Sequence, residues 1–265
     1  MSAAAAQNSE NLDYARRESL LQYIVGFDGQ ETVDDPNFGA RSDVPLGPVL
    51  DDLIFLHKKI RLRKCFTVLE FGVGYSTLIM ADALYKNKQD FEATANKPSI
   101  RCNNPFELHA VDASEHWINS FEETIAKHPE LRSFITLHTS TVSITTFNGR
   151  MCHAYDELPN VIPDFIYLDA PGTADVKGSL RGMTFQNCID RTVISADPCI
   201  FEPTLLPGCY IVIDGRTNNA RFLKRNFQRS WKYEWLKDRD VTTFELMEEP
   251  LGQLNFNMMH YCGLA

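Results

Sequence analysis

The sequence predicts an α/β fold, a three-layer sandwich in which helices cover both faces of a mostly parallel sheet. Two observations support this prediction. Residues 67–71 and 163–168 form short apolar runs, the composition of strands that are buried on both faces. Amphipathic helical patterns alternate with such runs along the chain, as expected when each strand is followed by a helix that packs on the sheet.

Two amphipathic helices are predicted ahead of the first strand. They cover residues 12–25 and 47–59, and a polar loop at 28–43 separates them. These helices either pack on the sheet or a partner subunit, or cover a binding site; the sequence leaves both roles open.

The first strand leads into a turn that contains two glycines, Gly72 and Gly74, preceded by the acid Glu70. Glycines let the chain turn tightly and let a ligand lie against bare backbone. Ser76 or Thr77 is predicted to cap the helix that follows. A dinucleotide-binding turn would carry a third glycine at position 77, and an acid here would repel a pyrophosphate.

A second strand over residues 106–112 ends in Asp112, and Ser114 is expected to open the next helix. An acid at the end of this strand could accept hydrogen bonds from two ribose hydroxyls. A helix cap or a solvated acid is the alternative. The polar stretch 86–105 before this strand has no clear period, and it is predicted to be an inserted loop.

Two more apolar strands are predicted to end in acids, Asp169 and Asp214. A helix over residues 220–227 and alternating strands at 231–236 and 242–247 follow them.

These features, in this order, resemble the class I S-adenosylmethionine-dependent methyltransferases with a Rossmann-like fold, of the small-molecule O-methyltransferase type. Glu70 ahead of Gly72 and Gly74 is similar to motif I of that family, and residues 67–215 carry the other matches. The resemblance implies a seven-stranded sheet with its last strand antiparallel, S-adenosyl-L-methionine as cofactor, and a small-molecule acceptor methylated at oxygen. It also implies an N-terminal segment, residues 1–63, that recognises substrate, and a methyltransferase-like domain at 64–265.

The resemblance also implies a set of site residues. Those expected to bind the cofactor are Glu70, Gly72, Gly74, Ser76, Asp112, Ala113, Ser140, Thr141 and Asp169. Those expected to take part in catalysis are Asp169, His153 and Asp214. Catechol-type relatives hold a divalent metal at acids equivalent to Asp169 and Asp214, but Gly215 stands where they carry an asparagine. We therefore name no metal ligand, and a Mg²⁺ requirement is the less favoured alternative.

Composition limits the class of partner. A net charge of −9 argues against nucleic acid, because binding to phosphates needs a basic face. The seven cysteines show no paired spacing, and no apolar run is long enough to span a bilayer. We expect a cytoplasmic protein without a membrane partner, and a homo-oligomer is left open. The alternative functions are an NAD-dependent oxidoreductase and a non-catalytic nucleotide-binding module.

Overall fold

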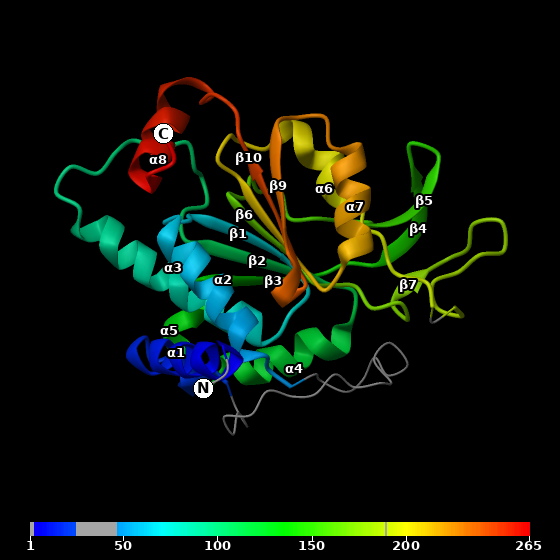
Figure 1. Cartoon of the computed structure of the whole chain (residues 1–265), viewed down its shortest axis with the longest axis horizontal. Coiled ribbons are helices and arrows are strands. Elements are labelled where there is room, and N and C mark those ends of the chain that lie inside the picture. The colour runs from blue at the N-terminus through cyan, green and yellow to red at the C-terminus, as the bar shows by residue number, and fades with distance from the viewer. Residues whose placement is uncertain (1–2, 25–46, 189) are drawn as a thin grey trace.

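The computed structural model describes residues 3–24, 47–188 and 190–265. The predicted loop at 28–43 lies outside these residues. Seven strands form the main sheet in the order β3-β2-β1-β6-β8-β10-β9 (Figure 1). They are β1 (Thr67–Phe71), β2 (Glu107–Asp112), β3 (Ile135–Thr139), β6 (Phe165–Leu168), β8 (Tyr210–Asp214), β9 (Trp231–Leu236) and β10 (Val241–Leu246).

Only β10, the last of the seven along the chain, runs antiparallel to its neighbours in this sheet. The other neighbouring pairs, from β3 across to β8, are parallel. The predicted fold class, a mostly parallel seven-stranded sheet with an antiparallel last strand, is therefore confirmed.

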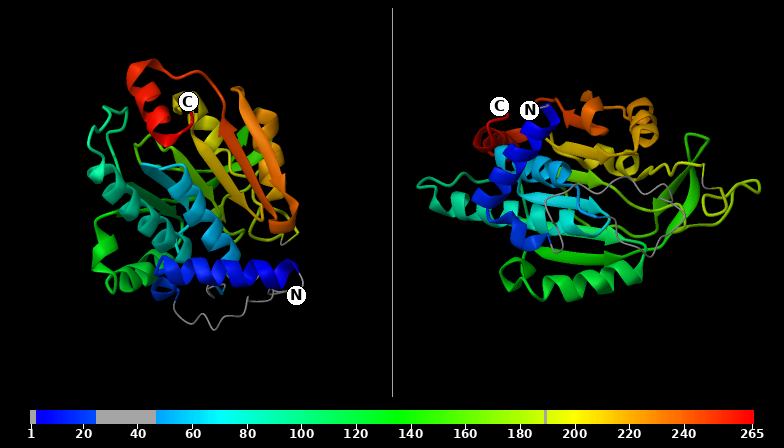
Figure 2. Two further views of the ribbon diagram at one scale, coloured as in Figure 1. Left: turned by 60° about the vertical axis from the view of Figure 1, so that its left-hand side comes forward. Right: turned by 60° about the horizontal axis from the view of Figure 1, so that its bottom comes forward.

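Helices cover both faces of this sheet, which gives the predicted three layers (Figures 1 and 2). One face packs against α1 (Ala3–Arg17), the 3₁₀ turn η1 (Leu20–Tyr23), α2 (Leu50–Leu62), α3 (Tyr75–Ala93), α4 (Glu115–Ile125), α5 (Pro129–Arg132) and α8 (Gly252–Cys262). The other face packs against α6 (Asp197–Phe201) and α7 (Thr217–Asn226). Two 3₁₀ turns, η2 (Glu202–Thr204) and η3 (Lys237–Arg239), complete the described elements.

A second sheet, which was not predicted, has the order β5-β4-β7. Its strands are β4 (Val142–Phe147), β5 (Arg150–Tyr155) and β7 (Val176–Lys177), and β4 and β5 project from one end of the molecule (Figures 1 and 2). The β4–β5 turn has positive φ at both Asn148 and Gly149, 51° and 71°. Asn-Gly is the residue pair that favours such a hairpin turn, so the sequence did carry this signal.

The prediction of an inserted loop at 86–105 is wrong over its first eight residues, because α3 continues to Ala93. Tertiary contacts stabilise this polar end of the helix. The amide of Asn87 donates to the carbonyls of Ile60 and Cys65 at 3.1 and 2.9 Å, and the Lys86 ammonium lies 2.7 Å from the Asp82 carboxylate.

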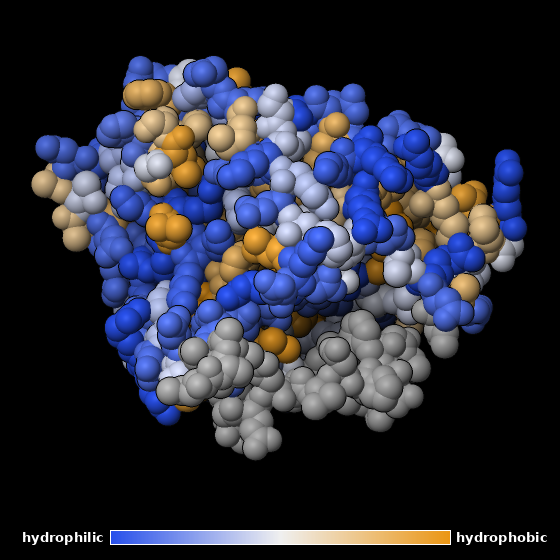
Figure 3. All heavy atoms as spheres, in the orientation of Figure 1, coloured by the Kyte–Doolittle hydropathy of each residue, from blue (hydrophilic) through white to orange (hydrophobic). Residues whose placement is uncertain are grey.

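The predicted helix over 12–25 instead begins at Ala3 and ends earlier than expected. It ends at Arg17, where Ser19 adopts a left-handed backbone with φ of 59°, and η1 follows. At the other end of the chain, the helix predicted to begin at 220 already begins at Thr217. No helix among the described residues is long and apolar enough to cross a membrane. Figure 3 shows one mainly hydrophilic face, with apolar side chains in scattered groups.

Candidate functional site

Glu70 lies at the end of β1, and its side chain is buried with 1% exposure. The Ser76 hydroxyl donates to Oε1 at 2.5 Å, while Oε2 has no hydrogen-bond partner among the residues that the structure describes. Burial raises the pKa of Glu70 from 4.5 to about 8, although the hydrogen bond from Ser76 lowers it. A buried carboxylate oxygen without a partner is costly, so this group is suited to a ligand that brings a hydrogen-bond donor.

The two glycines of the turn have different structural roles. Gly72 has φ of +119°, and a Cβ there would lie 3.3 Å from the Cβ of Ala170. Gly74 has extended backbone with φ of 173°, and no atom lies within 4 Å of a Cβ built on it. Backbone geometry therefore calls for glycine at 72, whereas at 74 it leaves open space beside the chain.

The predicted cap of α3 is corrected by this geometry. Gly74, and neither Ser76 nor Thr77, is the N-cap residue. The Thr77 hydroxyl instead accepts a hydrogen bond from the Gly74 N–H at 2.9 Å, and Ser76 is used by Glu70. Both side chains thus fix the turn from within the first helical turn.

Asp112 ends β2, the strand next to β1, and it is 7% exposed. Its carboxylate accepts the Ser114 N–H at 2.8 Å and also N–H groups of Ala113 and Val73. Burial raises the pKa of Asp112 to about 6 despite these hydrogen bonds. Because Val73 belongs to the glycine turn, the structure brings the Asp112 carboxylate to the same edge of the sheet as Glu70.

Three of the predicted acids also share one face of the sheet. Side chains alternate along a strand, and Ala110 and Val212 belong to the core cluster beneath α2 and α3. Glu70, Asp112 and Asp214 point toward this same face. The alternation of side chains along the strands thus places all three acids on the same face and at the same edge of the sheet.

Asp169 follows β6, and its side chain is 55% exposed. The Arg216 guanidinium donates to the carbonyls of Asp169 and Pro171 and lies 3.9 Å from the Asp169 carboxylate. Burial against surrounding protein atoms and the nearby Asp214 raise the pKa of Asp169 to about 7, whereas Arg216 lowers this pKa. Water still reaches the Asp169 side chain. Asp214 itself accepts a hydrogen bond from the Tyr167 hydroxyl at 2.8 Å.

Asp52, in the first turn of α2, was not predicted and belongs to this group of acids. Arg239 binds the neighbouring Asp51 at 2.6 Å, which fixes the start of α2 against the turn between β9 and β10. Burial, then Asp214, raises the pKa of Asp52 to about 7. From the sequence alone, an acid in the first turn of a helix is explained by its favourable interaction with the helix dipole. The proximity of Asp52 to the other acids therefore could not be predicted.

Ser140 and Thr141 lie between β3 and β4. The Ser140 N–H donates to the Asp112 carbonyl at 3.0 Å, and the Ser140 hydroxyl accepts the Glu157 N–H at 2.9 Å. The carbonyl of Thr141 accepts the N–H of Asp156 at 2.9 Å. The main sheet and the second sheet are joined at this point.

His153 lies on β5 and is fully buried. Neither ring nitrogen has a hydrogen-bond partner within the described part of the chain, and the ring packs edge-on against Phe185, with the ring centroids 6.1 Å apart. Burial lowers the pKa of His153 to about 3, so the ring is neutral. Phe185 belongs to the core cluster on the opposite face from the three strand acids, and the structure does not bring the His153 ring together with them.

Among the described residues, no group of three or more His, Cys, Asp or Glu side chains is arranged to hold a metal ion. Gly215 has no side chain to add to Asp169 and Asp214.

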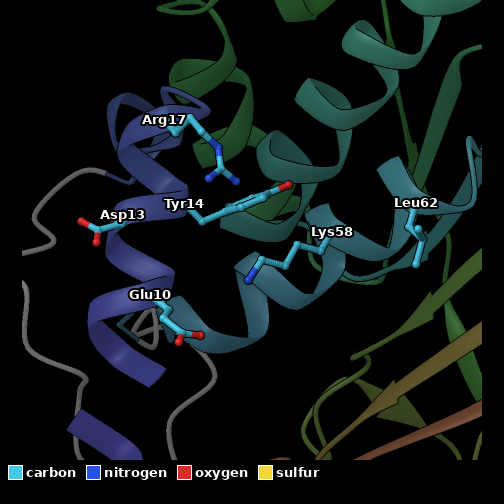
Figure 4. Close-up of a pocket in the computed structure, with 6 residues that line it drawn as sticks. All are labelled: Glu10, Asp13, Tyr14, Arg17, Lys58 and Leu62. Carbon is cyan, nitrogen blue, oxygen red and sulfur yellow. The ribbon is translucent and has the colours of Figure 1, made fainter. Parts of the chain in front are cut away.

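A separate surface hollow of about 530 Å³ lies between α1 and α2 (Figure 4). Its lining residues are Glu10, Asp13, Tyr14, Arg17, Lys58 and Leu62, none of which belongs to the sheet edge described above. Tyr14 links the hollow to the interior, since its hydroxyl lies 2.8 Å from Nδ1 of the buried His57.

No family model matches the chain, and no curated protein matches its sequence. Solved structures with a similar fold include three methyltransferases. The O-methyltransferase TomG from Streptomyces achromogenes, in complex with SAM, is 14% identical with a TM-score of 0.47, covering 94% of this chain and 100% of that one. SAH-bound PaMTH1 from Podospora anserina is 12% identical with a TM-score of 0.44, covering 91% and 88%. The O-methyltransferase from Bacillus cereus, in complex with SAH, is 14% identical with a TM-score of 0.39, covering 92% and 91%. At such identities the function has to be argued from the residues of this chain.

Proposed function

We propose that this protein is an S-adenosylmethionine-dependent methyltransferase that acts on a small molecule at oxygen. One observation carries the proposal: Glu70 has a buried carboxylate oxygen without a partner in residues 3–24, 47–188 and 190–265, and it lies on the strand next to the one that ends in Asp112. The ammonium group of the cofactor would donate to Glu70, and its ribose hydroxyls would donate to Asp112. The open space beside Gly74 leaves room for such a ligand against the backbone.

The same observation separates this proposal from an NAD-dependent oxidoreductase. A dinucleotide presents an anionic pyrophosphate to this turn, and the ionised form of Glu70, which a cationic ammonium favours, would repel it. A plain dinucleotide fold would also keep its sheet parallel, whereas β10 is antiparallel here.

The bound cofactor would supply an electrophilic methyl group, and the chain must position the acceptor and remove its proton. Asp169 is our first choice for the base, because its side chain is 55% exposed at the ends of the strands and its pKa is raised above the ordinary value. Asp214 is second, since it already accepts the Tyr167 hydroxyl. His153 is third because its neutral ring is fully buried.

Cofactor binding is tested by titration calorimetry with S-adenosylhomocysteine. We expect near-micromolar affinity, and Asp112→Ala should weaken it at least tenfold because two ribose hydroxyls lose their acceptor. Asp13→Ala, which removes an acid with 72% side-chain exposure, is the control and should bind like the unchanged protein. Unchanged affinity in Asp112→Ala would remove Asp112 from the site. If NADH raises the melting temperature of the protein and S-adenosylhomocysteine does not, the oxidoreductase function would be supported instead.

Turnover is tested with methyl-labelled cofactor and a panel of phenols, catechols and carboxylic acids. Removal of a general base costs about 10²–10⁴ in rate. Asp169→Asn should therefore lose at least a hundredfold in turnover while its affinity for S-adenosylhomocysteine stays within a few-fold. Cofactor binding without transfer to any acceptor would favour the non-catalytic module. Full activity after treatment with EDTA would exclude a metal requirement.

The remaining assignments are part of the same proposal. Residues 1–63 would cover the acceptor side of the site, and residues 64–265 would form the catalytic domain. The seven cysteines are free thiols, which supports a reducing cytoplasmic location. The net charge of −9 supports a small-molecule acceptor over a nucleic acid.

A further inference from the structure

We infer that the hydroxyl group of Tyr155, on the second sheet, donates a hydrogen bond to the nucleoside half of the cofactor. This inference rests on the proposed function. Tyr155 is not among the residues that the resemblance implies for cofactor binding.

The position of Tyr155 places it beside the proposed nucleoside site. Its ring packs against Phe71, the last residue of β1, with the ring centroids 5.7 Å apart. Both rings belong to the core cluster on the face of the sheet opposite Glu70, and Asp112, at the end of β2, is a charged neighbour of the Tyr155 hydroxyl. Tyr155 also pairs in register with Val142, the first residue after Ser140 and Thr141. The side chain therefore approaches the ends of β2 and β3 from the face opposite Glu70.

The hydroxyl of Tyr155 is buried and has no hydrogen-bond partner among the described residues. Only 6% of the residue is exposed. Its charged neighbours are Asp112, Asp197, Arg216 and Asp175, and each of these has other partners. Asp197 accepts the Tyr155 N–H at 3.1 Å and the Ser195 hydroxyl at 2.9 Å, while Arg216 donates to backbone carbonyls.

Burial and the nearby acids raise the pKa of Tyr155 well above its ordinary value, so the hydroxyl remains a neutral donor at physiological pH. A buried hydroxyl without a partner is unfavourable, and an acceptor on a ligand would remove that penalty.

The chemistry of the site explains which part of the ligand needs this donor. The carboxylates of Glu70 and Asp112 only accept hydrogen bonds, so they can bind the ammonium and the ribose hydroxyls. The adenine ring nitrogens and the ribose ring oxygen are acceptors, and neither acid can bind them. Ser140 uses its hydroxyl on Glu157 and Thr141. Tyr155 supplies the missing donor.

The test compares Tyr155→Phe with the unchanged protein by calorimetry and thermal unfolding. We expect affinity for S-adenosylhomocysteine to fall about 2–13-fold, since one hydrogen bond to a neutral donor contributes about 0.5–1.5 kcal/mol. The melting temperature without ligand should stay the same or rise, because the substitution removes only an unpartnered hydroxyl. Tyr85→Phe, on α3, is the matched control and should change neither affinity nor melting temperature.

Probes of each half of the cofactor locate the contact. Adenosine should lose the same factor as S-adenosylhomocysteine in Tyr155→Phe, and L-methionine should lose nothing. The 1-, 3- and 7-deaza analogues then identify the acceptor, because the substitution has no effect on the analogue that lacks the contacted nitrogen. If Tyr155→Phe weakens the binding of all three analogues, the Tyr155 hydroxyl contacts the ribose ring oxygen.

Two results separate the failure of this inference from that of the proposed function. If the unchanged protein does not bind S-adenosylhomocysteine, the proposed function fails. If it binds and Tyr155→Phe binds equally well, or only loses ligand-free stability, the inference about Tyr155 is overturned while the proposed function stands.

Discussion

Replacing Glu70 with glutamine should stabilise the protein without cofactor and weaken cofactor binding. The pKa of Glu70 is raised from 4.5 to about 8 by burial. Between these pH values the folded chain holds a proton that the unfolded chain releases, so the free energy of unfolding falls as the pH rises. One pKa unit corresponds to about 1.4 kcal/mol, which gives a cost of about 3 kcal/mol at pH 7 and about 5 kcal/mol above pH 8.

Glutamine has nearly the same shape but cannot ionise, and it can still accept the Ser76 hydrogen bond. In urea unfolding, Glu70→Gln should match the unchanged protein below pH 4.5. It should then gain about 1.4 kcal/mol per pH unit up to about pH 8. Asp13→Asn, at an exposed site, is the control and should show no such slope.

Ligand binding should change in the opposite direction. Loss of a hydrogen bond between charged groups costs about 1.5–3 kcal/mol, so Glu70→Gln should bind S-adenosylhomocysteine about 10–100-fold more weakly. At pH 7 the unchanged protein should release a proton on binding, which calorimetry detects as a dependence of the heat on the buffer. A stability difference independent of pH, or equal affinity in both proteins, would refute the assignment of Glu70 to the ammonium group.

Three further substitutions test the glycine turn and the polar network that joins α3 to α2. Gly72→Ala should lose about 1–3 kcal/mol in urea unfolding because φ there is +119°. Gly74→Ala should lose at most about 1 kcal/mol but weaken nucleoside binding about tenfold; equal binding would show that the space beside Gly74 is not used. Burial alone would raise the pKa of Asp82, but hydrogen bonds from His57 and Lys86 hold it below 3.8. The ionised Asp82 therefore stabilises the fold above pH 3.8, and this contribution is lost as the pH falls through the lowered pKa. Asp82→Asn should cost about 3–5 kcal/mol at pH 7, and a loss below 1 kcal/mol in urea unfolding would contradict a structural role for this network.

The sequence was sufficient to predict the main sheet and the edge at which the acids gather. Apolar runs identify buried strands, and in a parallel arrangement their ends meet at one edge. These conclusions need only local patterns, and this is why single-sequence reasoning could reach them. That Glu70, Asp112 and Asp214 share one face is a finding of the structure, in which the residue before each acid belongs to the opposite core cluster.

Features that depend on long-range contacts were not predicted. The extension of α3 to Ala93 depends on Asn87, whose partners belong to α2 and the segment after it. Asp52 approaches the strand ends only because Arg239, far along the chain, fixes the neighbouring Asp51. No local pattern distinguishes these polar residues from ordinary solvated ones, since their partners lie 20 or more residues away in sequence.

The unpartnered buried atoms also explain why sequence patterns point to the site more readily than they define it. A pattern can place Glu70 at a strand end, but it cannot show that one carboxylate oxygen is paired with Ser76 and the other with nothing. Tyr155 likewise reads as an ordinary apolar strand residue until its hydroxyl proves to be buried without an acceptor. Such groups are unfavourable in the protein alone, so their persistence beside Asp112 is best explained by a ligand that pairs with both. Substitution of Glu70 or Tyr155 should therefore keep or raise the stability of the ligand-free protein and weaken cofactor binding. Substitution of a residue that only supports the fold should instead lower the stability of the protein.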